Sequence, residues 1–268
     1  MAVITISRGT FSGGKMLAEC LGDKLGYRCI DRDVIVQRAA AYGVPEADLV
    51  DALAKPPSFW DRFRHRRYVY LTLIQAALTE EVQQGKAVYH GNAGHLLLRG
   101  VSHVLRTRII ATMAHRVRTV QDRLKLSEAD ALDHVQRMDQ DRQKWTHYLY
   151  GVDWADPSLY DLVVNLASID IPGACDLVSA AASLRCFDET PESQAAMDNL
   201  VLASRVRTAL ALAPGTSELE VAVVAHGGAV TIRGRLSPGV HFTAVESTVR
   251  AVPGVESVRL EVAPDIEA

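Results

Sequence analysis

The sequence predicts an α/β protein: a three-layer domain built on a parallel sheet, followed by a small α+β domain. Over residues 1–186, short β-branched runs alternate with helical patterns, which is typical of a parallel sheet covered by helices on both faces. A glycine-rich turn lies directly between the first predicted strand and the first predicted helix. Residues 197–268 instead follow the order helix, strand, strand, helix, strand (αββαβ), so we expect a separate fold there.

The elements of the first domain are predicted from the spacing of apolar residues and from turn residues. Val3–Ile6 is a β-branched run, Gly26 suits the end of the helix that follows, and Ser127 starts a capping pattern before a long helix. In chain order the predicted elements are strand 3–6, helix 16–25, strand 27–30, helix 68–82, strand 87–89, strand 104–111, helices 115–125 and 127–148, strand 161–165 and helix 172–184.

A polar and acidic stretch after the first domain contains Pro191 and indicates a linker, which we place at 187–196. The second domain is then expected at 197–268. Its predicted elements are helix 197–212, strand 219–224, a hairpin turn at 226–228, strand 229–236, helix 240–252 and strand 255–262.

The composition excludes several classes of protein. Apolar residues make up 48% and charged residues 23% of the 268 residues, a mixture typical of a globular protein. The 29 basic and 32 acidic residues give a net charge of −3, which makes a nucleic-acid-coating role unlikely. No run approaches the roughly 20 apolar residues that span a bilayer. Met1–Ser7 has no basic or long apolar stretch, so we expect no signal peptide and a cytoplasmic protein.

The turn after the first strand reads Gly9-Thr-Phe-Ser-Gly-Gly14-Lys15 and fits the pattern GxxxxGK. Glycines let successive backbone N–H groups point inward, and the positive end of the following helix adds to their pull on an anion. We therefore predict that this loop cradles the phosphates of a nucleotide, with the ammonium group of Lys15 as a further charge. The alternative is an ordinary glycine-rich turn. The residues assigned to phosphate binding are Gly9, Ser12, Gly13, Gly14 and Lys15.

Met16 departs from the usual loop of this kind, which has Ser or Thr at that position. The hydroxyl group there ligates Mg²⁺, and a soft thioether is a poor ligand for a hard cation. Ser12 is a candidate to compensate. Phosphate binding is thus better supported than efficient phosphoryl transfer. The histidines show no zinc-ligand spacing, so we expect no structural metal.

Two sets of motifs resemble one family, the cytidylate-kinase-like proteins, over about residues 1–185. The first set is Ile4-Thr-Ile-Ser-Arg8, Ser12-Gly-Gly14 and Ile30-Asp31-Arg-Asp-Val-Ile35. The second is Leu126-Ser-Glu-Ala-Asp-Ala131, Asp139-Gln-Asp-Arg142 and the stretch Tyr150 to Asn165. The resemblance implies a P-loop nucleoside-monophosphate kinase fold. It also implies transfer of the γ-phosphoryl group of ATP to CMP or dCMP with Mg²⁺.

The same resemblance implies roles for single residues. Asp31 begins the segment that binds the monophosphate, and Arg38 is a further contact there. Arg116 and Arg118 belong to a mobile lid and close over the γ-phosphate. Asp139 and Arg142, on one face of a helix, orient the acceptor or the metal.

Members of this subfamily commonly have Gly-Arg after the strand that precedes the lid, where this chain has Gly91-Asn92. Neutral Asn92 cannot replace a bidentate guanidinium clamp on a phosphate or base. Two functions therefore stay open: an active kinase, or a nucleotide-binding sensor with weak or no transfer. The basic run 62–67 is more often a solvated face than a margin of the nucleotide site or a nucleic-acid contact.

The C-terminal domain resembles a BON domain. The motifs that carry the resemblance are Gly228-Ala-Val-Thr-Ile-Arg-Gly234 and Val252-Pro-Gly-Val-Glu-Ser-Val258. The family implies a phospholipid surface or a protein as partner. The net charge of residues 1–186 is +2. Because the whole chain has a net charge of −3, residues 187–268 have a net charge of −5. A negative C-terminal domain argues against simple attraction to anionic lipid. We expect a regulatory or docking module, with a lipid or partner adaptor as the alternative.

Overall fold

The computed structural model describes residues 2–9, 12–54, 64–91, 93–236 and 239–264. They form two compact units. The first unit holds the described residues of 1–34 and 85–190, and the second holds those of 35–54, 60–84 and 191–268. The side chains of the run 62–67 lie outside those that the structure describes.

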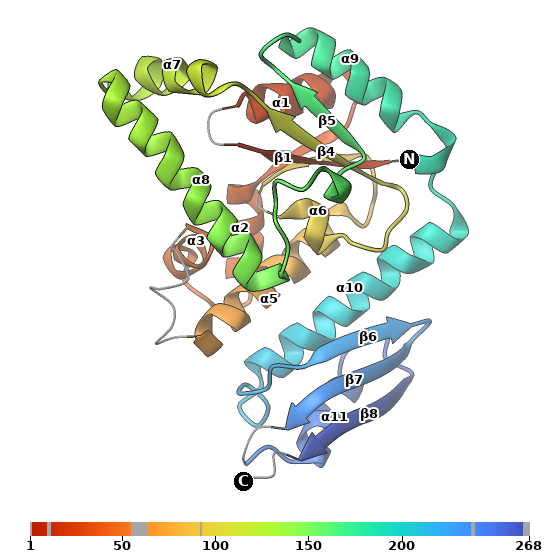
Figure 1. Cartoon of the computed structure of the whole chain (residues 1–268). Coiled ribbons are helices and arrows are strands. Elements are labelled where there is room, and N and C mark those ends of the chain that lie inside the picture. The colour runs from red at the N-terminus through yellow and green to blue at the C-terminus, as the bar shows by residue number, and fades with distance from the viewer. Residues whose placement is uncertain (1, 10–11, 55–63, 92, 237–238, 265–268) are drawn as a thin grey trace. The chain divides into compact units, whose positions relative to one another are not determined.

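The first unit is built on a parallel sheet, as predicted (Figure 1). Its elements are β1 (Val3–Arg8), α1 (Gly14–Leu25), β2 (Arg28–Asp31), the start of α2 (Arg32–Ala40), β3 (Ala87–His90), α6 (Gly94–Leu97), β4 (Val104–Ile110), α7 (Met113–Leu124), α8 (Glu128–Tyr150), β5 (Leu162–Asn165) and α9 (Ile171–Ala182). The strand order is β2-β3-β1-β4-β5, and every pairing is parallel. The carboxyl ends of the strands therefore meet at one edge, where ligands bind in folds of this kind.

Helices lie on both faces of this sheet. Ile4 and Ile6 of β1 point to the face that α1 and α9 cover, where they join a buried apolar cluster. Thr5, between them, points to the other face. There a side chain on Gly94 of α6 would meet the methyl group of Thr5 at 3.4 Å and the ring of Tyr89 at 2.5 Å. Glycine is thus required where α6 approaches the sheet.

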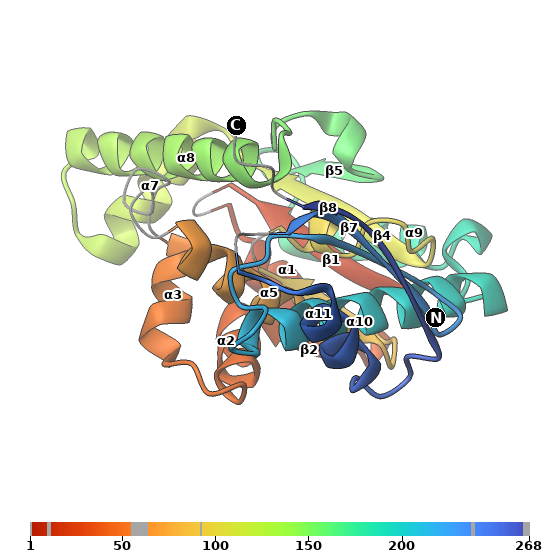
Figure 2. The same cartoon turned by 90° about the horizontal axis from the view of Figure 1, so that it is seen from below.

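Helices α7 and α8 form an antiparallel hairpin, and α8 is seen along its length in Figure 2. Thr112 caps α7 by accepting a hydrogen bond from the backbone of His115, and Ser127 caps α8 by accepting one from Asp130. Such caps satisfy N–H groups that have no partner inside the helix. A seam of Val117, Val120, Ala131 and Val135 holds the two helices together.

The second unit contains a three-stranded sheet among its described residues, in the order β6-β7-β8. Its elements are the remainder of α2, α3 (Glu46–Ala54), α5 (Arg64–Val82), α10 (Pro191–Leu212), β6 (Ala222–His226), β7 (Ala229–Leu236), α11 (Phe242–Arg250) and β8 (Ser257–Pro264). Strands β6 and β7 are antiparallel, and β7 and β8 are parallel. Residues of α10 and α11 share one apolar core with the sheet. The predicted order αββαβ is present, and the resemblance to a BON domain stays a prediction.

Helix α10 begins at Pro191, so the second half of the predicted linker 187–196 is helical. The proline that suggested a linker lies at the first position of a helix, where its missing N–H group costs nothing. Helix α10 packs against α5. For this reason the compact units do not follow the predicted domain limits of 186 and 197.

Helices α2 and α3 lie where the sequence predicted no element. Helix α2 follows β2 without a loop, because Asp31 both ends the strand and caps the helix. No turn residue therefore marks the boundary. Among the described residues, no helix has the combination of length and apolar character that a membrane crossing requires.

A matched pair of substitutions tests the core of the second unit. Ile232 of β7 is fully buried, whereas Val224 of β6 is half exposed. We expect Ile232→Ala to lower the free energy of unfolding by about 3 kcal/mol, because it leaves a cavity. Val224→Ala should cost less than about 1 kcal/mol. Urea denaturation followed by circular dichroism measures both, and equal losses would contradict this assignment of the two faces.

Candidate functional site

The loop between β1 and α1 requires its glycines. Gly13 has φ of 86° and ψ of 2°, a left-handed conformation that favours glycine. A Cβ atom on Gly13 would lie 3.0 Å from Leu166 Cδ1, and one on Gly14 would lie 2.4 Å from Arg8 Cδ. The backbone at the start of α1 is therefore closely covered by side chains from β1 and from the segment after β5. Thr10 and Phe11 lie outside the described residues.

Ser12 holds the loop from inside. Its side chain is fully buried, and its hydroxyl group donates a hydrogen bond to Gly9 O at 2.9 Å. The proposed compensation for Met16 by this hydroxyl group is thus not supported, because Ser12 faces the loop backbone. Met16 itself is half exposed.

Lys15 lies at the first turn of α1 with 65% of its side chain exposed. Its Nζ is 3.8 Å from Glu19 Oε1, one turn along the helix. An exposed ion pair of this kind is weak, so the ammonium group can exchange it for a phosphate.

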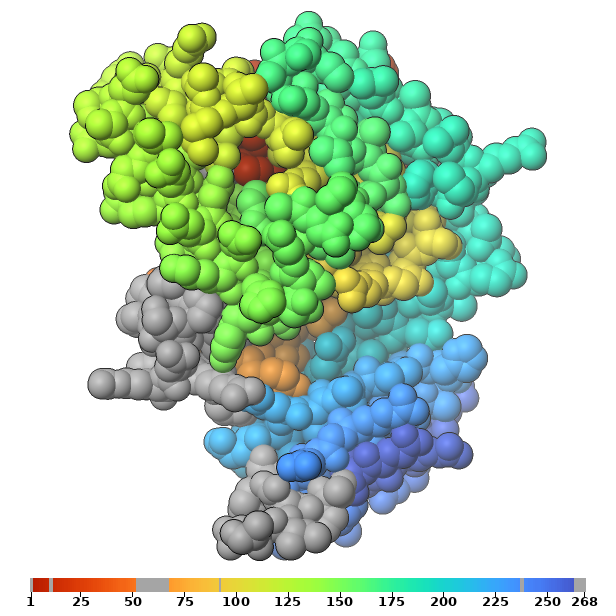
Figure 3. Space-filling view, in the orientation of Figure 1, coloured from red at the N-terminus to blue at the C-terminus, as the bar shows by residue number. Residues whose placement is uncertain are grey.

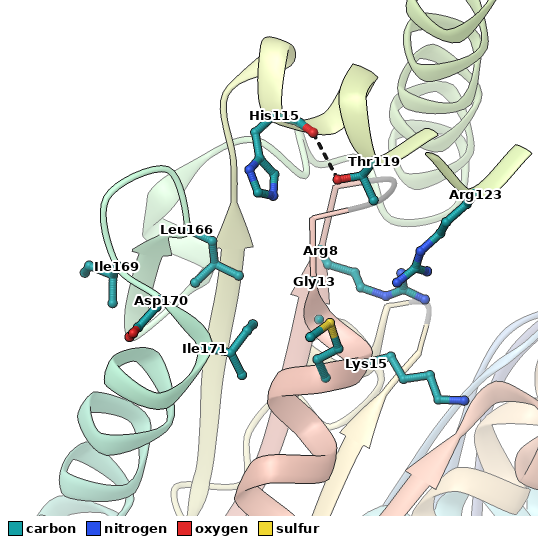
Figure 4. A pocket seen from close by; sticks show the side chains of 12 residues that line it. Arg8, Gly13, Lys15, His115, Thr119, Arg123, Leu166, Ile169, Asp170 and Ile171 are labelled. Carbon is teal, nitrogen blue, oxygen red and sulfur yellow. Dashed lines mark hydrogen bonds between the residues drawn. The ribbon is translucent and has the colours of Figure 1, made fainter. Parts of the chain in front are cut away.

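A pocket of about 370 Å³ opens in front of the loop. In Figure 3, red atoms of the N-terminal segment are visible at the bottom of a hollow between yellow-green and green segments. Cationic and apolar side chains line different parts of the pocket (Figure 4). The lining residues are Arg8, Gly13, Gly14, Lys15, Met16, His115, Thr119, Arg123, Leu166, Ile169, Asp170 and Ile171.

The cationic part combines Arg8, Lys15 and Arg123. Figure 4 shows the guanidinium groups of Arg8 and Arg123 on the same side of the loop. Burial lowers the pKa of Arg8, and the charge of Arg123 lowers this pKa further. Like charges that converge in a hollow attract an anion. The pocket is therefore suited to a polyanion.

Arg116 and Asp139 connect α7 to α8 beside the loop. The two nitrogens of the guanidinium group each lie 2.7 Å from a different oxygen of Asp139, and the pair is largely buried. A Cβ atom on Gly9 would lie 3.4 Å from Arg116 Cζ. The structure thus brings three predicted residues, Gly9, Arg116 and Asp139, together.

Arg142 reaches the loop by a backbone contact. Its Nη1 donates a hydrogen bond to Arg8 O at 2.5 Å. Burial lowers the pKa of Arg142 to about 10, with the charge of Arg8 as a further cause. The group is therefore still cationic at neutral pH, and it fixes α8 to the residue that precedes the loop.

The structure does not bring Arg118 to the loop. Arg118 is exposed and lines a separate pocket of about 360 Å³ with Met113, Glu128 and Leu132. His115, Thr119 and Arg123 line the loop pocket instead. Positions separated by four residues share a helix face, whereas Arg118 points elsewhere. The sequence prediction missed Arg8 and Arg123, and this spacing is the signal that could have identified Arg123.

Asp31 caps α2: its Oδ1 accepts hydrogen bonds from the backbone of Asp33 and of Val34, each at 2.9 Å. In the sheet it pairs with His90, whose ring is buried and whose Nδ1 has no hydrogen-bond partner among the described residues. Burial lowers the pKa of His90, and Arg8 acts in the same direction, whereas Asp31 acts against it.

Two predicted contacts cannot be placed at the loop. Arg38 belongs to the second unit, where its Nε lies 2.6 Å from Glu81 Oε2. Asn92 lies outside the described residues.

These residues fit the phosphates of a nucleoside triphosphate better than they fit a metal. The glycine cradle and three cations suit phosphate oxygens. The described residues contain no group of three or more His, Cys, Asp or Glu that could hold a metal ion. Mg²⁺ bound here would depend on phosphate oxygens and water, a common arrangement for this ion.

The N-terminal two thirds of the chain has counterparts among known proteins. Cytidylate kinases of Ignicoccus hospitalis and Methanothrix thermoacetophila are each 25% identical to this chain, over 170 and 180 residues. These matches cover 62% and 67% of this chain and 91% and 96% of the relatives. The crystal structure of an uncharacterized protein from Eubacterium ventriosum shares the fold, with a TM-score of 0.52 and 16% identity over 68% of this chain and 97% of that chain.

The model of the cytidylate kinase-like family matches residues 3–168, more than half of the 268 residues. The matched part contains β1, the glycine loop and the α7–α8 hairpin. The chain therefore belongs to the cytidylate kinase-like family.

Proposed function

We propose that this chain is a nucleoside monophosphate kinase that transfers the γ-phosphoryl group of ATP to CMP or dCMP. The observation that carries the proposal is the loop pocket, which combines a phosphate cradle with an apolar wall. The acceptor is proposed from the cytidylate kinases that the chain resembles. The C-terminal αββαβ segment is proposed as a docking or regulatory module.

ATP would occupy the pocket with its two chemically different ends in two different environments. The phosphates would lie against the amides of Gly13 and Gly14, with Lys15, Arg8 and Arg123 around them. The purine would lie at the apolar wall of Leu166, Ile169 and Ile171. An apolar wall with a few charged groups at one end is typical of cofactor sites.

Transfer needs positioning and charge neutralisation more than acid–base chemistry. A phosphate oxygen of the acceptor, already anionic, forms a bond to Pγ while the bond from Pγ to the β-phosphate oxygen breaks, which gives ADP and CDP or dCDP. Lys15 would stabilise charge on the transferred group, and Arg116, held by Asp139, would approach it from the lid. Mg²⁺, when bound with ATP, supplies further charge neutralisation.

A second function has a specific observation in its favour. Met16 offers a half-exposed thioether where a hydroxyl group usually ligates the metal. A nucleotide-binding sensor with little or no transfer would keep the phosphate cradle and tolerate this change. Both functions require ATP to bind, and they differ in turnover.

The release of ADP separates the two functions. We expect the purified chain to release ADP from ATP and Mg²⁺ in the presence of CMP or dCMP, and less with UMP or AMP, in a coupled assay. Lys15→Ala should lower kcat/KM by about 100-fold, because it removes a charge aimed at the transferred group. ATP binding without acceptor-dependent ADP would contradict the kinase and support the sensor.

The two exposed arginines of α7 give a matched test of the pocket. Arg123 lines it and Arg118 does not. We expect Arg123→Ala to weaken ATP binding by about fivefold, the effect of about 1 kcal/mol. Arg118→Ala should change it by less than about twofold. Equilibrium binding of a fluorescent ATP analogue measures both, and a larger loss for Arg118→Ala would contradict the placement of these side chains.

The contribution of the Arg116–Asp139 ion pair can be measured as a change in the free energy of unfolding. Asp139→Asn should lower the free energy of unfolding by about 3 kcal/mol, because it leaves a buried guanidinium group without its counter-charge. Asp133→Asn on the same helix breaks the exposed pair with Arg137 and should cost less than about 1 kcal/mol. Urea denaturation compares them. Similar costs would show that Arg116 finds another partner.

A further inference from the structure

Two thiol groups meet where helices α1 and α9 pack against each other in the first unit (Figure 1). Cys20 of α1 packs against the apolar cluster that contains Cys175 of α9, and the two thiol groups are hydrogen bonded to each other. Lys24 of α1 forms an ion pair with Asp176 of α9 beside them. The ion pair and the thiol contact together fix which faces of the two helices meet.

These two thiols differ from the other cysteines in their surroundings. All four cysteines lie among the described residues and are free. Cys29 of β2 and Cys186, after α9, are exposed, whereas Cys20 is partly buried and Cys175 is buried. An exposed cysteine that is alone can accept a small thiol from solution, whereas two thiols in contact can form a bond with each other. The pair on α1 and α9 is therefore placed for an intramolecular disulfide.

The difference in burial gives the two sulfur atoms different parts in such a reaction. The thiolate is the form that attacks a disulfide, and the attack needs access from solvent, which Cys20 has. Burial raises the pKa of Cys175 to about 12, and the hydrogen bond and charge of Cys20 are further causes. Those two causes disappear once Cys20 has joined a mixed disulfide, whereas the positive charge of Lys24, which lowers this pKa, stays. Cys20 is therefore the attacking thiol, and Cys175 is the resolving thiol.

The helix faces that carry the two thiols also carry residues of the loop pocket. Met16 lies on α1 four residues before Cys20, and residues four apart share a helix face. Ile171 stands in the same relation to Cys175 on α9, and Met16 and Ile171 both line the pocket. A disulfide holds two sulfur atoms closer than any non-bonded contact does. This bond would thus draw Met16 toward Ile171 and narrow the pocket between the loop and its apolar wall.

We propose that Cys20 and Cys175 form a reversible disulfide that weakens the binding of ATP. The oxidant is a low-molecular-weight disulfide of the glutathione class. The Cys20 thiolate attacks one of its sulfur atoms and releases the first small thiol, and the Cys175 thiolate then attacks the Cys20 sulfur and releases the second. Two protein thiols are oxidised by two electrons, the small disulfide is reduced to two thiols, and these thiols take up the two protons that the protein loses. An excess of small thiol reverses both steps.

The effect on ATP rests on the proposed function, in which ATP occupies the loop pocket. The disulfide itself does not rest on that function, because it depends only on the contact between α1 and α9. The two parts of the proposal are therefore measured separately, both on the full chain.

Peptide mapping tests the disulfide. The reduced chain is incubated with oxidised glutathione, the remaining thiols are alkylated, and the chain is digested without reductant for mass spectrometry. We expect a peptide pair linked through Cys20 and Cys175, with Cys29 and Cys186 alkylated or carrying single glutathione groups. The double variant Cys29→Ser/Cys186→Ser should form the same link. The triple variant that adds Cys20→Ser should not form it.

Equilibrium binding of a fluorescent ATP analogue tests the effect on the pocket. We expect the oxidised double variant to bind the analogue about fivefold more weakly than its reduced form does, and dithiothreitol to restore the affinity. The triple variant keeps the buried Cys175 thiol but cannot form the bond, so its affinity should be the same before and after oxidation. This comparison separates the disulfide from any glutathione group on the exposed cysteines.

The proposal is overturned if Cys20 and Cys175 stay unlinked, or if Cys20 joins Cys29 instead. The mapped bond together with an unchanged or higher affinity for ATP would overturn the effect on the pocket. If the reduced chain binds no ATP, the kinase and the sensor are both contradicted and the effect on ATP is overturned with them. The mapped disulfide would still be supported in that case.

Discussion

The close approach of side chains to the backbone after β1 constrains everything around the candidate site. Gly13 must adopt a left-handed conformation, and Gly14 must leave room for Arg8. Ser12 closes the turn from inside, and Arg142 fixes the carbonyl oxygen of Arg8 from outside. The loop is thus held by contacts that do not involve a ligand. Its amides and Lys15 remain available for one, which is the preorganisation that phosphate binding and charge stabilisation need.

The sequence predicted those parts of the fold that depend on local pattern. The β-branched runs correspond to the strands of the parallel sheet, and the glycine motif lies at the end of β1. Helix α2 was missed because Asp31 is at once the last residue of a strand and the cap of a helix. The resemblance assigned Arg116 and Arg118 of α7 to a lid. The loop pocket is lined by Arg123 and not by Arg118, and helical spacing from His115 and Thr119 selects Arg123.

The organisation of the C-terminal part shows a different limit. A proline among polar residues looks the same in sequence whether it interrupts a chain or starts a helix, and Pro191 starts one. The contact between Glu80 and Arg205 joins residues 125 positions apart. No pattern within either segment can reveal such a pairing. Local composition therefore indicated a separate domain, while packing of α10 on α5 groups it with helices from early in the chain.

The clustered positive charges of the candidate site favour the binding of an anion. Burial lowers the pKa of Arg8 and of Arg142. The charge of Arg123 lowers the pKa of Arg8 further, and the charge of Arg8 lowers that of Arg142 further. In the described part of the site Asp139 neutralises Arg116. Arg8, Lys15 and Arg123 line one pocket, where Lys15 forms an exposed ion pair with Glu19 and the carboxylate of Asp170 accepts a hydrogen bond from the backbone of Gly173. A carboxylate placed among them would relieve the repulsion and fill the place of the phosphates. Because an anion that binds only the folded state stabilises that state, a bound triphosphate would offset the repulsion among these three cations.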